Sequence, residues 1–182
     1  ATAITIDSSE NVTLAGTING VTIKADITNF TDSILISQNA STGTLSSASN
    51  NTGLGDSVFA ALTSGTSNVA IGNAAGTALT TGGGNTLIGS NAGDSLTTGT
   101  TSVAIGTNAL HTATTATGNV AIGYQALDVN TASNNTAIGL DAMGSNTTGD
   151  LNVAIGALAL DANTEGDRSV AVGYSALGSQ NP

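Results

Sequence analysis

The chain has 182 residues, a formal net charge of −10 and only two basic residues, Lys24 and Arg168, so it has no basic patch for a nucleic-acid partner. Hydrophobic residues make up 39% and charged residues 8%, which excludes a charge-rich disordered chain, while aromatic residues, at 2%, are too few for an ordinary compact core. There is no cysteine for disulfides or thiol chemistry, and the uncharged run 57–93 is too rich in Gly, Thr, Asn and Ser for membrane insertion.

Short stretches that alternate apolar and polar residues indicate β-strands in the first fifty residues. They are Ala3–Ile6, Asn11–Leu14, Thr17–Ile23 with the turn signal Asn19-Gly20 inside it, and Ser33–Ser37. A linker rich in Ser, Ala, Asn, Thr and Gly follows. We therefore predict that residues 1–50 form a strand-rich cap or connector that covers the open edge of a second domain, residues 51–182.

From Asn51 onward, a five-residue phrase of the type Asn-Val-Ala-Ile-Gly recurs eight times. The copies begin at residues 51, 68, 85, 102, 119, 135, 152 and 169, so the period is 17 except for one interval of 16, and the last copy stops at Pro182. We number the repeat positions from 1, the Asn or Ser, to 17. The copies are named coil 1 to coil 8 in chain order.

Each position of the repeat has a physical role. Positions 2 and 4 are β-branched or aliphatic, as in a short strand, and position 13 is Thr in every complete copy. Position 5 is always glycine, which indicates a positive φ or a close backbone approach. The residues expected to define the structural repeat are Gly55, Gly72, Gly89, Gly106, Gly123, Gly139, Gly156, Gly173, Ile71, Ile88, Ile105, Ile122, Ile138 and Ile155.

Seventeen residues are too few for a helix pair or a propeller blade and suit one coil of a β-solenoid. Eight coils about 4.8 Å apart would form a rod, with stacked Asn and Thr side chains satisfying one another in ladders. We expect the Ile and Val rows to face the coil interior. The alanines at position 3 are expected to face outward, against neighbouring chains, and they are Ala70, Ala104, Ala121, Ala137, Ala154 and Ala171.

The phrase Asn-Val-Ala-Ile-Gly-x-x-Ala-Leu resembles the head repeats of trimeric autotransporter adhesins (the YadA-like family) and the closely similar repeats of phage tail fibres. Residues 135–149 are similar to the tail-fibre version, Asn-Thr-Ala-Ile-Gly-x-x-Ala-Leu-x-x-Asn-Thr-Thr-Gly. The resemblance covers residues 51–182. It implies an all-β, left-handed parallel β-roll in which three chains associate into a homotrimeric rod.

Within this resemblance, the constant period and the lack of lysine after Lys24 favour a phage tail fibre shaft, located in the virion, that spaces or presents a receptor-binding tip. The alternative is the head of a bacterial adhesin on the cell surface, which would bind host matrix or a glycan. Thr-rich solenoids that bind ice suggest a third function for the Thr rank Thr63–Thr164. Those proteins, however, carry two Thr ranks on a flat strand face, whereas position 13 lies in a turn.

No residue pattern points to catalysis. His111 is the only histidine and has no acid at a fixed partner offset, so we predict no enzyme and no cofactor. Tyr124 and Tyr174, both at position 6, could stack on a sugar or be tolerated surface substitutions.

One segment has the oxygen spacing of a calcium loop: Asp161, Asn163, Glu165 and Asp167, with Gly166 at the sixth place. Its twelfth place is Val172 in place of Glu, and the segment coincides with the ordinary turn of the repeat. A turn is therefore favoured over a metal site.

Overall fold

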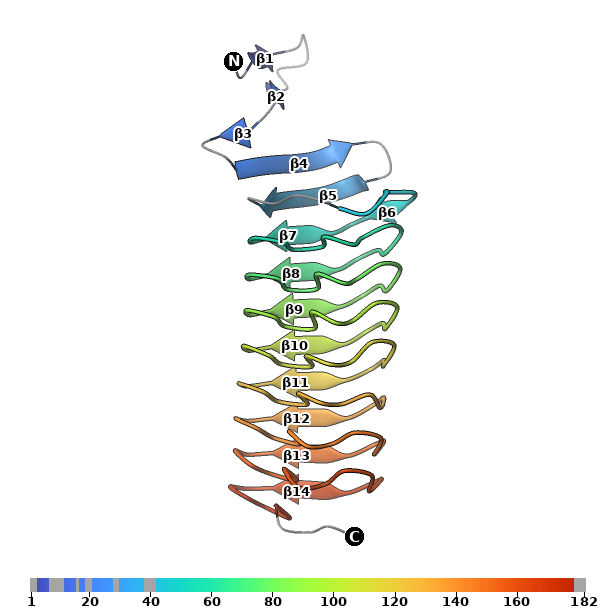
Figure 1. The fold of residues 1–182 in the computed structure, drawn as a ribbon, viewed down its shortest axis with the longest axis vertical. Helices are drawn as coiled ribbons and strands as arrows, with labels where there is room; N and C mark the ends of the chain where they lie inside the picture. Colours follow the sequence, from blue (N-terminus) through green and yellow to red (C-terminus); the bar gives the residue numbers. More distant parts are fainter. Residues whose placement is uncertain are drawn as a thin grey trace.

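The chain forms an elongated stack of β-strands (Figure 1). The computed structural model describes residues 3–6, 12–15, 17–18, 21–27, 30–37 and 42–178, and these contain fourteen strands and no helix. The predicted all-β class is confirmed.

The N-terminal strands pair mainly antiparallel. One pair forms a separate two-stranded sheet, whereas the others continue into the main sheet. The expected hairpin is confirmed because β3 pairs antiparallel with β4, although Asn19 and Gly20 themselves lie outside the described residues. The bounds are β1 (Ala3–Ile6), β2 (Val12–Ala15), β3 (Thr17–Ile18), β4 (Val21–Ile27), β5 (Phe30–Ser37) and β6 (Ala48–Ser49).

The repeat forms the body of the stack. Each copy contributes one three-residue strand, which pairs in parallel with its equivalents at the same repeat positions; Ala104, for example, lies opposite Ala121. The predicted β-solenoid of about eight coils is confirmed. Its strands are β7 (Thr52–Leu54), β8 (Val69–Ile71), β9 (Thr86–Ile88), β10 (Val103–Ile105), β11 (Val120–Ile122), β12 (Thr136–Ile138), β13 (Val153–Ile155) and β14 (Val170–Val172).

The stack extends one coil further toward the N-terminus than the recognisable repeat. β5 pairs in parallel with β7, and Ser33 Oγ accepts a hydrogen bond from Asn51 N at 2.8 Å, as Asn51 Oδ1 does from Asn68 N at 3.0 Å. Ser46, 17 residues before Thr63, donates its amide to the Thr63 carbonyl. Ser33–Ser37 and residues 42–50 therefore belong to a degenerate leading coil, and β4 pairs with its outer edge.

The interior of each coil is filled from four repeat positions. Positions 3, 8 and 9 carry small and large apolar side chains that are buried together, and position 12 is Leu or Ala in coils 1–4 but a buried Asn in coils 5–7. The largest fully buried apolar side chains are Phe59, Leu35, Leu62, Leu79, Leu87, Leu96, Leu110, Leu127, Met143 and Val58.

The coil bends inward at left-handed backbone positions that recur in every repeat. Positions 7, 9 and 17 have positive φ even where the residue is not glycine, for example Asn108 at 56°, Leu110 at 55° and Thr101 at 55°. Such angles are uncommon for large side chains, so packing must hold Leu110 in this conformation. The buried Leu110 side chain fills the coil interior.

Candidate functional site

The two faces of the solenoid sheet are the reverse of those we predicted. Ala104 is fully buried, whereas its neighbours Val103 and Ile105 on the same strand are only partly buried. The expectation that alanines face outward is wrong. Where positions 8 and 9 are an Ala-Leu pair, as in coil 4, this pair already fills the interior of the coil, so only a small residue fits at position 3.

The β-branched and aliphatic residues of positions 2 and 4 therefore form an outer strip along the sheet. It contains no charged residue, and its exposed fraction reaches 48% at Leu54, 39% at Ile155 and 67% at Val172. Its length over eight strands is about 38 Å at the usual strand spacing. We name this surface the outer strip; it consists of Thr52, Leu54, Val69, Ile71, Thr86, Ile88, Val103, Ile105, Val120, Ile122, Thr136, Ile138, Val153, Ile155, Val170 and Val172.

Glycine at position 5 ends each strand at the edge of the outer strip. Gly72 and Gly106 both have φ of 135°, and a Cβ on Gly72 would collide with the carbonyl oxygen of Gly89 in the next coil. Both reasons offered from the sequence, a positive φ and a close backbone approach, are confirmed.

The hydroxyl groups of the Thr rank bond to the backbone of the next coil. Thr80 Oγ1 donates to the Thr97 carbonyl at 3.0 Å, and Thr97 Oγ1 donates to the Thr114 carbonyl at 2.9 Å. These hydroxyl protons bond to neighbouring backbone and not to one another. The expected hydroxyl-to-hydroxyl ladder is therefore wrong. Because the hydroxyl protons already bond to backbone carbonyls, the Thr rank gives no support to an ice-binding face at position 13.

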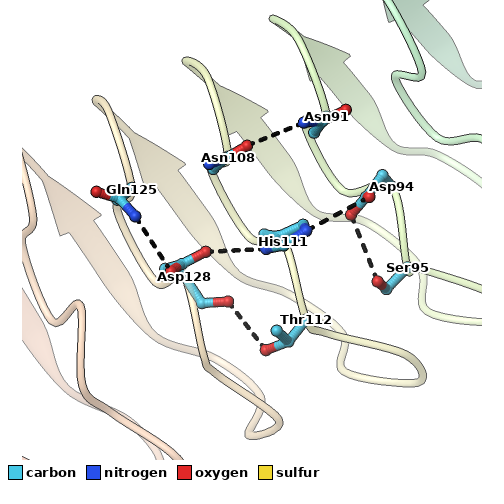
Figure 2. Close-up of polar contacts among 8 residues, drawn as sticks. All are labelled: Asn91, Asp94, Ser95, Asn108, His111, Thr112, Gln125 and Asp128. Carbon is cyan, nitrogen blue, oxygen red and sulfur yellow. Dashed lines mark hydrogen bonds and ion pairs between the residues drawn. The ribbon is translucent and has the colours of Figure 1, made fainter.

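His111 is the centre of a polar cluster that spans three coils (Figure 2). Its Nε2 lies 3.5 Å from Asp94 Oδ2 in coil 3, and its Nδ1 lies 3.2 Å from Asp128 Oδ1 in coil 5. All three residues occupy repeat position 10. The two acids thus lie one repeat before and one repeat after His111. They are distant from His111 in the sequence and were missed there, although the 17-residue period could have revealed them.

The cluster is not arranged for nucleophilic catalysis. Both ring nitrogens of His111 face carboxylates, and among the described residues neither nitrogen contacts a hydroxyl group. Burial raises the pKa of Asp94 above its ordinary value of 3.8, an effect that outweighs the opposing attraction of His111 and the hydrogen bonds from Ser95.

The residues of the calcium-like segment do not share one ligand site. Asn163 is buried and donates to Asn146 Oδ1 at 3.0 Å, while Asp167 Oδ1 accepts from Asp150 N at 2.8 Å. Asp161 Oδ1 is buried without a hydrogen-bond partner. Among the described residues, no group of three or more His, Asp or Glu could hold a metal ion.

Tyr124 and Tyr174 are both exposed, by 50% and 78%, and Leu140 at the same repeat position is 50% exposed. In coils 1–4 this position is polar, as in Asp56 and Asn73. An exposed apolar row is therefore present only in the C-terminal half of the stack.

Comparison of the chain with protein-family models, with curated proteins and with solved structures found no match. In the part of the chain that the structure describes, no helix is long and apolar enough to cross a membrane.

Proposed function

We propose that the chain is a non-enzymatic segment of a trimeric surface fibre, a rod that spaces or presents a binding tip. The outer strip is the observation that carries this proposal. Soluble monomers rarely expose a long, largely apolar surface, and a strip of Val, Ile, Leu and Thr without any charge favours another apolar surface as its partner. A second copy of the same chain offers such a surface.

The number of chains and the handedness come from the resemblance of the repeat. The adhesin heads and tail fibres that it resembles are trimers of left-handed β-rolls, and three chains can turn their outer strips toward one common axis. Stacked coils with parallel ladders then give stiffness along the rod. Among the two kinds of fibre, the constant period and lysine-poor sequence favour a phage tail fibre shaft in the virion.

Sedimentation of the purified chain tests the association. We expect a trimer for the native sequence and a shift toward monomer for Ile105→Lys, because a buried ammonium in an apolar interface is costly. Thr98→Lys, on an exposed turn, is the matched control and should leave the trimer intact. A native chain that sediments as a monomer at micromolar concentration contradicts the proposal.

The alternative proposal is an adhesin head that binds host matrix or a glycan through its own surface. The exposed apolar row with Tyr124, Leu140 and Tyr174 favours it, since aromatic rings can stack on sugars. Binding of the isolated chain to glycan or matrix-protein arrays would support the adhesin, and absence of binding would support a spacer.

A further inference from the structure

Two rows of residues border the outer strip at the two ends of each strand. One is position 17 of the preceding coil, two residues before the first residue of the strip, and the other is position 6, two residues after the last. Both rows continue along the stack, since the Leu158 amide donates to the Leu140 carbonyl at 2.9 Å and the Arg168 amide donates to the Asp150 carbonyl at 3.1 Å. The strands run across the long axis (Figure 1), so the two border residues of one strand lie at about the same height.

The borders change character in the middle of the stack. Beside β7–β10 both borders are polar or glycine, with Asp56, Asn73, Ser90 and Thr107 at position 6. Beside β11–β14 the residues of position 6 are large or apolar, and they are Tyr124, Leu140, Ala157 and Tyr174. The surface that continues the outer strip is therefore wider in the C-terminal half.

Leu151, on the position 17 border, combines exposure with an unusual backbone angle. Its φ is 61°, which is uncommon for a large side chain. Leu110 has a similar φ of 55°, but its side chain is buried in the coil, whereas Leu151 is 50% exposed. Half of the Leu151 side chain thus has no packing partner in the described part of the chain, which points to a contact with another chain.

The two borders complement each other at three of these four strands. The pairs at the two ends of one strand are Gly118 and Tyr124 for β11, Leu151 and Ala157 for β13, and Arg168 and Tyr174 for β14. The first two pairs combine a large residue with a small one. The third combines a cation with an aromatic ring, and Arg168 forms no ion pair with any described residue. Because about 20 Å separates the two ends within one chain, the members of a pair can meet only between chains.

We propose that the position 17 border of each chain packs against the position 6 border of the next chain in the trimer. This inference rests on the proposed function. Three outer strips that face a common axis place the start of each strand beside the end of the next chain's strand, at equal height. Leu151 then packs on Ala157 of the next chain, between Leu140 and Tyr174. A pair of antiparallel rods would instead bring each border against its own copy.

Cysteine cross-linking of the 182-residue chain tests the pairing, because the native sequence has no cysteine. On oxidation with diamide, the double variant Leu151→Cys/Ala157→Cys should form a covalent trimer on a non-reducing gel, since a disulfide joins Cα atoms less than about 7 Å apart. We expect about tenfold more covalent trimer than in the control Leu151→Cys/Thr107→Cys. Thr107 is also exposed at position 6 but borders β10, about 14 Å along the stack from β13.

A second pair, Arg168→Cys/Tyr174→Cys, should also cross-link and keeps the test available if the first variant fails to fold. Sedimentation of the same variants separates the outcomes. A trimer that neither pair links overturns the pairing and leaves the proposed function standing, and so does a covalent dimer formed by Leu151→Cys alone. A chain that sediments as a monomer contradicts the proposed function and the pairing together.

Discussion

At the scale of single residues, the asparagine of position 1 forms the most completely bonded group of the stack. Asn68 is fully buried; its Nδ2 donates to Asn51 Oδ1 and to the Gly82 carbonyl, both at 3.0 Å. Its Oδ1 accepts from the amide of Asn85 at 3.0 Å and from Asn85 Nδ2 at 3.1 Å. A buried amide is tolerated because every polar atom is satisfied, and each Asn also satisfies the backbone of its own turn.

Ser102 interrupts this ladder and offers a test of how much the ladder stabilises the fold. We expect Ser102→Asn to raise the free energy of unfolding by about 1 kcal/mol, because the new amide can reach both Asn85 Oδ1 and the Ala116 carbonyl. The reverse change at an intact rung, Asn68→Ser, should lower it by about 1–3 kcal/mol by leaving the buried Gly82 carbonyl unpaired. Urea unfolding measures both. Equal effects of the same sign would contradict this role of the amide.

The sequence predicted the Asn ladder because identical polar residues 17 apart must stack if the coils do. It did not predict the second ladder at position 12, where Asn146 Nδ2 donates to Asn130 Oδ1 at 2.7 Å and Asn163 Nδ2 donates to Asn146 Oδ1 at 3.0 Å. In coils 1–4 the same position is Leu or Ala, so the periodicity alone marks it as apolar. Whether a polar residue there is satisfied depends on the turn carbonyls, such as Gly149 O, which only the folded coil brings near.

At the scale of the coil, core volume is conserved by paired exchanges. Coils 4, 5, 7 and 8 combine Ala at position 3 with Leu at position 9, but coil 3 combines Leu87 with Gly93. A Cβ on Gly93 would lie 2.8 Å from Leu87 Cδ2, and a Cβ on Gly76 would lie 2.8 Å from Leu87 Cδ1. The large side chain has thus moved from the turn to the strand, and the glycines leave it room.

This exchange predicts strong coupling. Leu87→Ala should cost about 2–5 kcal/mol by opening a cavity, and Gly93→Leu alone should cost about 1–3 kcal/mol by overpacking. The double variant restores the arrangement of the other coils and should recover most of the lost stability, as a thermal-denaturation double-mutant cycle would show. Additive losses in the double variant would disprove the compensation.

The alternation pattern could not predict which face of each strand points into the coil. A strand such as Val103–Ile105 is apolar at all three positions, so period 2 separates two faces without saying which is inside. Residue size decides it, because the short coil admits Ala104 but not a β-branched residue beside Leu110. The consequence for the site is direct: the surface available to a partner carries Ile and Val, and not Ala.

At the scale of the whole molecule, the stack is a one-dimensional assembly in which each coil contacts its two neighbours. The 17-residue period was sufficient to predict this architecture. The sequence did not reveal the leading coil, to which Ser33–Ser37 and residues 42–50 belong, because Ser33 and Ser37 replace the Asn and Gly of the phrase and the interval from Ser33 to Asn51 is 18 residues in place of 17. The His111 cluster was missed for a related reason, since residues far apart in sequence meet only once the register is applied.

Removal of one whole coil tests the one-dimensional character of the fold. Deletion of residues 152–168 joins Leu151 to Ser169, which brings coil 8 onto coil 6 with every repeat position in register. Position 3 then pairs Ala137 with Ala171, as it now pairs Ala154 with Ala171. We expect a folded chain with unchanged β-sheet circular dichroism per coil and a modestly lower melting temperature, because one nearest-neighbour interface is lost.

Deletion of residues 152–160, about half a coil, is the matched control. It leaves the rest of coil 7 too short to return to the sheet, so the strand of coil 8 can no longer meet β12 in register. The control should lose the order of everything after coil 6, seen as faster exchange of the Val170–Val172 amides. If both deletions melt alike, the stack behaves as a single cooperative body in which coils are not independent units, and the nearest-neighbour description does not hold.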